Sequence, residues 1–480
     1  MPKIAMIGAG SMVFCKTLLN DMFSTPALAD AEYALMSPTE SKVRAMAAFA
    51  QQMAAGAGVG AKVWATTDRR AAIADADYVV CMVQVGGVEA FRQDYEIPLK
   101  YGVDQCIGDS LGPGGVLRGL RSIPVLAEMA CDIERTARPA ALLLNYTNPM
   151  AACCRALGRV AAAPAIGLCH GVQTTLDLIS GYVGVPKPEI DFLCAGINHM
   201  AWFLKLEHHG RDLYPLFKER CEQPGYYVNE KVRIEVMRQF GYFMTESTGH
   251  LSEYLPWFRS SQRAMAAYCD EPAFGGESGA YYHWCQLVAD KYAQRNPLEF
   301  DSPALEPRSA EYCSYILEAR ETGLPFRLQG NVRNDGYITN LPAGCCVEVP
   351  VYVDREGLHP LRVGDLPPQL AALNQTNVTV QTLAVEAGLS GDPELVVAAV
   401  ALDPLTSACC TLAEVRAMVT ELLTAEARWL PQFEGRLPRP TPVISVPVDV
   451  ARADVPLDPA LAIGKRFAKL ATQETAPAAD

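Results

Sequence analysis

The N-terminal stretch of residues 1–14, MPKIAMIGAGSMVF, decides the fold that we expect. Lys3 to Ile7 predicts a short buried strand, Gly8-Ala9-Gly10-Ser11 a tight turn, and Ser11 to Met22 a helix. Glycines let the backbone approach a pyrophosphate closely, and the free N–H groups of a helix N-terminus attract its negative charge. We therefore expect a dinucleotide, NAD, at this turn. The predicted cofactor contacts are Gly8, Ala9, Gly10, Ser11, Met12, Val13, Phe14 and Ser37.

Two positions depart from the usual dinucleotide motif GxGxxG. Its third glycine would fall at Val13, so the helix packs differently there. The acid that usually holds the adenosine ribose would end the second strand, where this chain has Ser37. A missing carboxylate removes a barrier to a 2′-phosphate, so the sequence leaves NADP open beside NAD. Lys42 and Arg44 are near enough in sequence to help bind such a phosphate, but we favour their interpretation as solvated helix charges.

Strands and helices alternate along the first half of the chain. Alternation of this kind is typical of a parallel sheet with helices on both faces. The fold class that we expect is therefore α/β, with a Rossmann-like doubly wound parallel sheet in an NAD-binding domain over residues 1–190. Further strands are predicted over Tyr33 to Met36, Tyr78 to Val85, Ala141 to Asn145 and Ala165 to Cys169, and a helix over Ser41 to Met53.

The second half has a different pattern. Asp191 to Gly196 and Trp202 to His208 predict antiparallel strands, and Gly336 to Val353 a further strand. We expect an α+β domain for substrate binding and oligomerisation over residues 191–436. A Pro- and Ala-rich C-terminal extension, partly disordered, is expected over residues 437–480. Helices are predicted over Glu230 to Phe243, Gly279 to Gln294, Val378 to Ala387 and Thr411 to Ala425.

Composition narrows the class of partner and the compartment. The formal net charge of −13 makes the chain a poor binder of polyanions, so we expect neither nucleic acid nor a membrane as a partner. No run of 18 apolar residues and no signal-peptide pattern occurs, which favours a cytoplasmic location. The 16 cysteines are scattered without a CxxC pair, so we expect reduced thiols, at least one of which could bind a metal.

Four segments place polar residues beside glycine or proline at the ends of predicted strands. Ligands of doubly wound folds bind at the carboxyl ends of the strands, so all four could converge on one crevice beside the cofactor. Each segment alone has a structural explanation, as a core cysteine, a hydrogen-bonded core histidine or a turn. Their joint occurrence is what favours a site. The segments are Gly108 to Gly115, Asn145 to Pro149, Gly167 to Gly171 and Gly196 to Met200.

These segments resemble glycoside hydrolase family 4, and within it the α-galactosidase branch. The resemblance covers residues 3 to 435 and includes IGAGSMVF, the run from QVGGVEAF to GLRSIP, LNYTNPM, GLCHGVQ, CAGINHMAWFLKLE and GNVRNDGYITNLPAGCCVEV. It implies a fold like that of lactate and malate dehydrogenases. It also implies a homodimer or homotetramer that uses NAD and a divalent metal, usually Mn²⁺.

The resemblance also implies roles for single residues. Cys169 and His199 match the metal ligands, and His170 matches the general acid for the leaving-group oxygen. Asn148 matches a contact to the sugar hydroxyls, and Asp109 a polar group near the metal. The catalytic base lies in the loop MTESTGHLSEYLPWF, where Glu246, His250 and Tyr254 are the candidates and Glu246 is slightly favoured. For Tyr254, packing against Trp257 and Phe258 is an equal alternative.

The implied reaction is hydrolysis of an α-glycoside by transient oxidation. NAD takes the hydride from C3, the C2 proton becomes acidic and is removed, the glycosidic oxygen leaves, and C3 is reduced again. The CHG sequence at His170 favours an unphosphorylated sugar, an α-galactoside. An α-glucoside or a uronide stays open, and Arg333 could bind a carboxylate, although a structural salt bridge is its favoured role. Rival classes are an NAD(P)-dependent dehydrogenase and a non-catalytic NAD-binding regulator.

Overall fold

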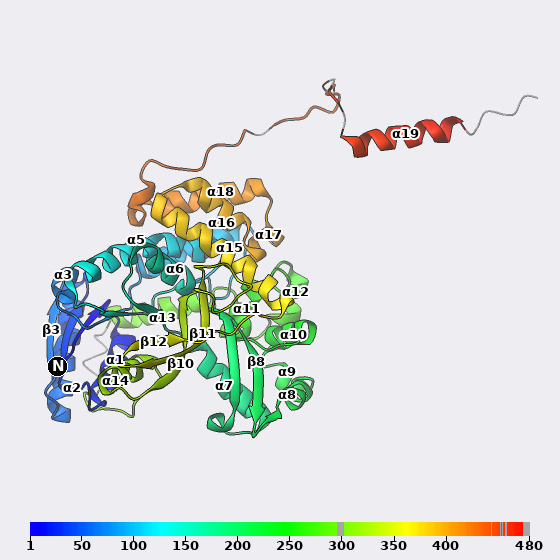
Figure 1. The fold of residues 1–480 in the computed structure, drawn as a ribbon. Helices are drawn as coiled ribbons and strands as arrows, with labels where there is room; N and C mark the ends of the chain where they lie inside the picture. The colour runs from blue at the N-terminus through cyan, green and yellow to red at the C-terminus, as the bar shows by residue number, and fades with distance from the viewer. Residues whose placement is uncertain (295–301, 443, 452, 454, 457, 474–480) are drawn as a thin grey trace, which may run out of the picture. The chain divides into compact units, whose positions relative to one another are not determined.

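The computed structural model describes residues 1–294, 302–442, 444–451, 453, 455–456 and 458–473. The chain forms two units, Met1–Arg439 and Pro440–Asp480. The first unit contains the sheet and nearly all of the helices (Figure 1). The second contains the helix α19 (Pro459–Gln473), which the sequence did not predict.

The described strands of the first unit form one mixed sheet in the order β3-β2-β1-β4-β5-β6-β10-β11-β7-β8-β9, with β12 beside β11. Neighbours from β3 to β6 are parallel, and all later pairs are antiparallel. The expected doubly wound parallel sheet is thereby confirmed. The strands are β1 (Lys3–Ile7), β2 (Glu32–Met36), β3 (Lys62–Thr66), β4 (Tyr78–Cys81), β5 (Leu142–Asn145), β6 (Ala165–Gly167), β7 (Asp191–Ile197), β8 (Met200–His208), β9 (Arg211–Asp212), β10 (Phe326–Arg333), β11 (Cys346–Asp354) and β12 (Gly357–Pro360).

Helices cover the parallel strands on both faces. On β1, Ile4 and Met6 belong to one apolar cluster, whereas Ala5 and Ile7 belong to another on the opposite face. The helices of the first unit are α1 (Met12–Phe23), α2 (Glu40–Ala57), α3 (Arg69–Ile73), α4 (Gly87–Lys100), α5 (Gly112–Thr136), α6 (Met150–Val160), α7 (Gly171–Val183), α8 (Tyr214–Cys221), α9 (Pro224–Tyr227), α10 (Lys231–Phe240), α11 (Thr248–Tyr254), α12 (Gln262–Tyr268), α13 (Ala280–Gln294), α14 (Tyr312–Thr322), α15 (Pro368–Ser390), α16 (Pro393–Ala401), α17 (Pro404–Cys409) and α18 (Leu412–Ala425), with short 3-10 turns between some of them.

The parallel strands and the strands β7 to β9 are separated by the β10–β11 hairpin, with a narrow joint on each side of this hairpin. β6 pairs with β10 through Gly167 and Asn331, and β11 pairs with β7 through Glu348 and Gly196. Asn331 and Glu348 are themselves opposite each other on β10 and β11. Each joint is a single registered residue pair, in contrast to the eight-residue ladder between β10 and β11. The sheet therefore narrows between its two parts.

Three predicted strands were too long. β6 ends at Gly167 rather than Cys169. In the other two, a side chain bonds the backbone in place of a neighbouring strand. β4 ends at Cys81 rather than Val85, since the Thr147 hydroxyl accepts the Val83 N–H at 3.0 Å. Residues 336–345 are not strand, because the Asn334 amide donates to the carbonyl oxygens of Ile338 and Leu341. β3, β10 and the long helix α5 were not predicted. Among the described residues, none of the helices has both the length and the apolar character that a membrane span requires.

The turn between β1 and α1 is built on glycine as the sequence predicts. Gly8 has φ +97°, and a Cβ atom there would lie 2.5 Å from the carbonyl oxygen of Met82 at the end of β4. The N–H groups of Gly8 and Ala9 both donate to the Met36 carbonyl oxygen at 2.9 Å, which ties the turn to the end of β2. The turn is thus fixed between the carboxyl ends of two neighbouring strands, where a dinucleotide is expected.

Replacement of Gly8 by alanine tests this geometry. Gly8→Ala adds a left-handed backbone cost of roughly 1–2 kcal/mol and a contact with Met82, so we expect a lower melting temperature and weaker NAD binding. The matched control is Gly181→Ala, because Gly181 lies in α7 with no neighbour near its Cβ position. Alanine there raises stability by up to about 1 kcal/mol. Equal melting temperatures for the two variants would contradict the strained turn.

Candidate active site

Three side chains of types that commonly bind metals come from separate elements and lie close together. Cys169 follows β6, His199 lies in the turn between β7 and β8, and Glu246 precedes α11. The Cys169 thiol is 3.4 Å from Oε1 of Glu246, and Nε2 of His199 is 3.8 Å from the same oxygen. One ligand atom from each residue lies within 4.8 Å of the others. The structure thus brings the two predicted metal ligands together with the favoured candidate for the base.

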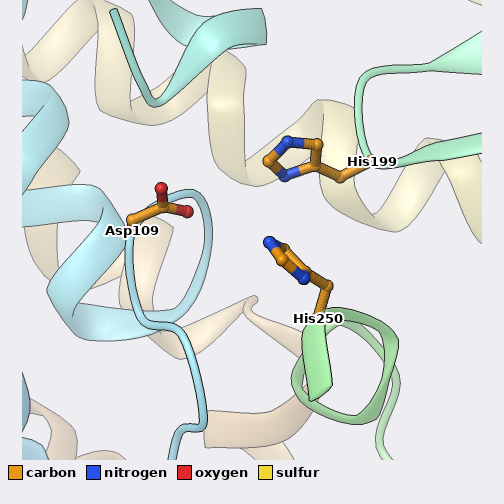
Figure 2. Close-up of side chains that lie close together, drawn as sticks. All are labelled: Asp109, His199 and His250. Atoms are coloured by element: carbon orange, nitrogen blue, oxygen red, sulfur yellow. The ribbon is translucent and has the colours of Figure 1, made fainter. Parts of the chain in front are cut away.

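His199 also belongs to a second group. Its ring, the ring of His250 on α11 and the carboxylate of Asp109 before α5 place one ligand atom each within 4.8 Å of one another. Figure 2 shows the three side chains pointing toward a common space. Nδ1 of His250 is 3.9 Å from Oε2 of Glu246, so the two groups are continuous. Sulfur, imidazole nitrogen and carboxylate oxygen together suit a borderline divalent transition metal.

The backbone is strained where it presents two of these groups. His199 has φ +62° and Glu246 has φ +71°, the left-handed region that non-glycine residues rarely adopt. The residue after His170 must also be small. A Cβ atom on Gly171 would lie 1.9 Å from Oε1 of Glu246, so only glycine leaves room for this carboxylate beside Cys169. The strained backbone and the space left by Gly171 therefore both help to position the Glu246 carboxylate.

Tyr254 orients the ring of His199. Its hydroxyl is 3.0 Å from Nδ1 of His199, and the Ser110 hydroxyl is 3.2 Å from the same nitrogen. These contacts leave Nε2 to face Glu246, as in metal-binding histidines whose second nitrogen is held by a partner. Burial raises the pKa of Tyr254 well above its usual value, so the phenol stays protonated. Trp257 stacks on Phe240, and Tyr254 shares the apolar core with Phe258 while its hydroxyl contacts His199.

Asn148, the predicted contact to the sugar, and Asp109, the predicted polar group near the metal, are hydrogen-bonded to each other. The Asn148 side-chain amide donates to Oδ2 of Asp109 at 2.8 Å, and the Ser110 hydroxyl donates to Oδ1 at 2.8 Å. Asp109 is almost fully buried. Burial acts to raise the pKa of Asp109. The charges of Arg118, His199 and His250 outweigh burial and lower the pKa below its usual value, so the carboxylate is ionised.

His170 lies at the mouth of the site beside an acid that the sequence did not reveal. Its side chain is 64% exposed, and Nδ1 is 3.6 Å from Oε1 of Glu311. The interaction with Glu311 raises the pKa of His170 above its usual value, which favours the protonated, acidic form. Glu311 is 141 residues away in sequence, and no motif pointed to it.

Electrostatics of the buried groups favour a bound cation. For Glu246, burial acts to raise the pKa, but the histidines 199, 250 and 170 outweigh burial and lower it to about 2. Burial and the nearby carboxylates raise the pKa of the Cys169 thiol. Burial and the charge of Glu246 raise the pKa of Glu348, on β11, to about 8. A cation bound among these groups would relieve their mutual repulsion and stabilise the thiolate.

One more residue, unforeseen from the sequence, holds the Asp109 loop in place. The Glu253 carboxylate on α11 accepts the backbone N–H groups of Cys106, Ile107 and Gly108 at 2.8, 2.9 and 2.9 Å. Burial raises the pKa of this carboxyl group to about 7, and the N–H groups of Ile107 and Gly108 oppose that rise. Glu253 is next to Tyr254, so the helix that orients His199 also fixes Asp109.

At the predicted cofactor site, Ser37 is buried beside the glycine turn. A Cβ atom on Gly10 would lie 2.7 Å from the Ser37 hydroxyl oxygen, so the two residues pack closely. Arg44 pairs with Glu40 one turn earlier on α2, with both side chains exposed, which agrees with the interpretation as a solvated helix charge. Arg333 is half exposed and pairs with Asp335 at 3.1 Å, which is the structural role favoured for it.

Comparison with known proteins gives matches over most of the chain. A family model described as "Family 4 glycosyl hydrolase" matches residues 3–185, and one described as "Family 4 glycosyl hydrolase C-terminal domain" matches residues 194–406. An α-galactosidase of Rhizobium meliloti (strain 1021) is 41% identical over 441 residues, which cover 90% of this chain and 89% of that protein. An α-galactosidase of Bacillus subtilis (strain 168) is 38% identical over 439 residues, covering 90% and 100%.

Solved structures show the same fold. A putative glucosidase, lplD, from Bacillus subtilis superposes with a TM-score of 0.78 at 25% identity, covering 88% of this chain and 100% of that one. The 6-phospho-β-glucosidase from Thermotoga maritima, solved with manganese, NAD⁺ and glucose-6-phosphate, gives a TM-score of 0.73 at 20% identity, covering 89% and 99%.

Replacement of Glu253 by glutamine tests the anchoring of the Asp109 loop. An amide has one oxygen where the carboxylate has two, so at least one of the three N–H groups loses its charged acceptor, at a cost of about 1.5–3 kcal/mol. We expect a clearly lower melting temperature. The control is Glu40→Gln, in which only an exposed pair with Arg44 is lost, at a cost of about 0–0.5 kcal/mol. Melting curves that coincide for both variants would contradict the anchoring role.

Proposed function

The chain belongs to family 4 of the glycosyl hydrolases, and we propose that within this family it hydrolyses unphosphorylated α-galactosides with NAD and Mn²⁺. The observation that carries the proposal is the group of Cys169, His199 and Glu246, whose ligand atoms lie within 4.8 Å of one another. The α-galactoside as substrate is supported by two relatives of that activity, 41% and 38% identical over 90% of the chain.

The residues present fit a catalytic metal. Cys169 and His199 would hold the cation, and two protein ligands leave coordination positions for sugar hydroxyls. The chemistry that the two cofactors supply is reversible removal of the C3 hydride and polarisation of the resulting ketone, which makes the C2 proton acidic. Free cysteines throughout the chain suit a reducing compartment, so we place the enzyme in the cytoplasm. We also propose a homodimer or homotetramer.

Glu246 is the base that we propose for the C2 proton. It is held ionised by the neighbouring histidines, with its pKa lowered to about 2. Tyr254 is less suited, because its hydroxyl is engaged with His199 and burial raises its pKa. His250 has its Nδ1 2.8 Å from the Ser247 hydroxyl oxygen, and burial lowers its pKa.

His170 would donate the proton that the leaving glycosidic oxygen takes up. It is exposed at the mouth of the site, where the leaving group must depart, and the hydrogen bond with Glu311 raises its pKa. Asn148 and Asp109 would hydrogen-bond the sugar hydroxyls and hold the ring over the site. A plain dehydrogenase would require no such acid for a leaving group, and the His170–Glu311 pair therefore favours the glycosidase over that rival.

The deciding experiment is a panel of nitrophenyl α- and β-glycosides assayed with NAD⁺, Mn²⁺ and a thiol, each omitted in turn. We expect release of nitrophenol from the α-galactoside when all three are present, and no accumulation of NADH, because the hydride returns to C3. Net formation of NADH would instead indicate a dehydrogenase. NAD⁺ binding without turnover of any glycoside would indicate a regulator.

Cys169→Ser should abolish turnover and leave NAD⁺ binding nearly unchanged, because the thiol lies with the metal-type groups and not at the Gly8 turn. Turnover is measured with the nitrophenyl α-galactoside, and cofactor binding by calorimetry. Full activity of the variant without added metal would contradict the assignment of Cys169 as a ligand.

His170→Ala should separate substrates by their leaving groups. Loss of a general acid costs roughly 10²- to 10⁴-fold for a sugar leaving group, but little for nitrophenolate, which departs without protonation. The comparison is kcat/KM for an α-galactosyl disaccharide against the nitrophenyl galactoside. Losses of the same size on both substrates would remove His170 from the role of acid.

A further inference from the structure

Arg118, on α5, is a buried cation without a hydrogen-bonded partner. The residue is 7% exposed, and Nε and Nη1 are buried with no acceptor in the described part of the chain. Its guanidinium group lies 5.4 Å from the centre of the Phe91 ring. Arg121, one turn later on α5, is also buried, but its charge is balanced by ion pairs with Asp94 and Glu426. An unpaired buried charge is costly, so a partner for Arg118 is expected from outside the chain.

The direction of the Arg118 side chain follows from the helix. Side chains on a helix tilt toward its N-terminus and cover the preceding turn, which here contains Gly114 and Gly115. That turn packs directly on the loop before α5. A Cβ atom on Gly115 would lie 2.5 Å from the carbonyl carbon of Ser110, and one on Gly114 would lie 3.1 Å from the Gly108 carbonyl oxygen. Arg118 is therefore directed toward the loop that carries Asp109.

Electrostatics agree with this direction. Burial is the largest influence on the pKa of Asp109 and acts to raise it, and Arg118 is the largest of the influences that lower it. The two side chains do not form an ion pair with each other, so the guanidinium N–H groups remain available. Asp109 already accepts hydrogen bonds from Asn148 and Ser110.

The site has two sides with different chemistry. Nε2 of His199 faces Glu246 at 3.8 Å, and Glu246 contacts Cys169. Nδ1 of the same ring is 3.2 Å from the Ser110 hydroxyl, which donates to Asp109, and Asp109 accepts from Asn148. In the proposed function Glu246 removes the C2 proton and His170 protonates the oxygen on C1. C1 and C2 of the sugar must then lie on the Glu246 side. C4 and C6, at the opposite end of the ring, are left for the side of Asp109.

We propose that Arg118 binds the hydroxyl groups at C4 and C6 of the substrate sugar, an assignment that rests on the proposed function. A hydroxyl group can accept a hydrogen bond from Arg118 and donate one to Asp109 at the same time. Arg118 is thus a substrate-binding residue that distinguishes sugars by the end of the ring remote from the cleaved bond.

The test compares Arg118→Met with the native enzyme on three substrates: nitrophenyl α-D-galactoside and its 4-deoxy and 6-deoxy analogues. We expect kcat/KM on the galactoside to fall roughly ten- to hundredfold, the range of one charged hydrogen bond. On each deoxy analogue the fall should be smaller than on the galactoside, since the native enzyme has already lost one of the two contacts. Arg118→Lys, which keeps a donor, should recover part of the activity on the galactoside.

The controls separate this proposal from the proposed function. Arg333→Met should change none of the three values, and NAD⁺ binding of Arg118→Met should match that of the native enzyme. Equal losses on all three substrates would overturn the assignment of Arg118 and leave the proposed function standing. A native enzyme that cleaves no α-galactoside would overturn both. If Arg118→Met does not fold, the same comparison is made with Arg118→Lys.

Discussion

The whole site depends on how the Glu253 carboxylate binds the backbone of the loop before α5. Three N–H groups in succession, from Cys106 to Gly108, converge on this one side chain of α11. The same helix carries His250 and Tyr254, and Tyr254 in turn contacts His199. The buried Glu253 carboxylate thereby helps to set the distance between Asp109, in the first half of the chain, and His199, in the second half.

The site concentrates negative groups and restrains them with cations. Glu246 and Glu348 lie near the Cys169 thiol, Asp109 is buried beside Asn148, and the nearest compensating groups are histidines and Arg118. Such an arrangement is stable only if further positive charge and further hydrogen-bonding groups arrive with the ligands. A divalent cation beside Cys169 and sugar hydroxyls beside Arg118, as we propose, would meet this requirement.

Much of the fold and part of the site could be predicted from local sequence. The turn at Gly8 and the residues Asn148 and Cys169 follow buried strands of a parallel sheet, whose carboxyl ends share one edge. His199 is different, because it lies in a turn between antiparallel strands, and its role as a metal ligand with Cys169 came only from the resemblance. Glu253 and Glu311 act across 145 and 141 residues, and no local pattern carries such pairings. The loop held by Asn334 was mistaken for strand because its apolar residues mimic the strand pattern.

The two single-pair joints of the sheet give the metal site a mechanical role. Gly167 and Gly196 are each joint residues, and Cys169 and His199 follow them by two and three positions. A twist of the parallel strands against β7 and β8 therefore changes the separation of the thiol and the imidazole. A cation held by both residues, as we propose, would link the two parts of the sheet across the β10–β11 hairpin, and its binding energy would add to the stability of the folded chain.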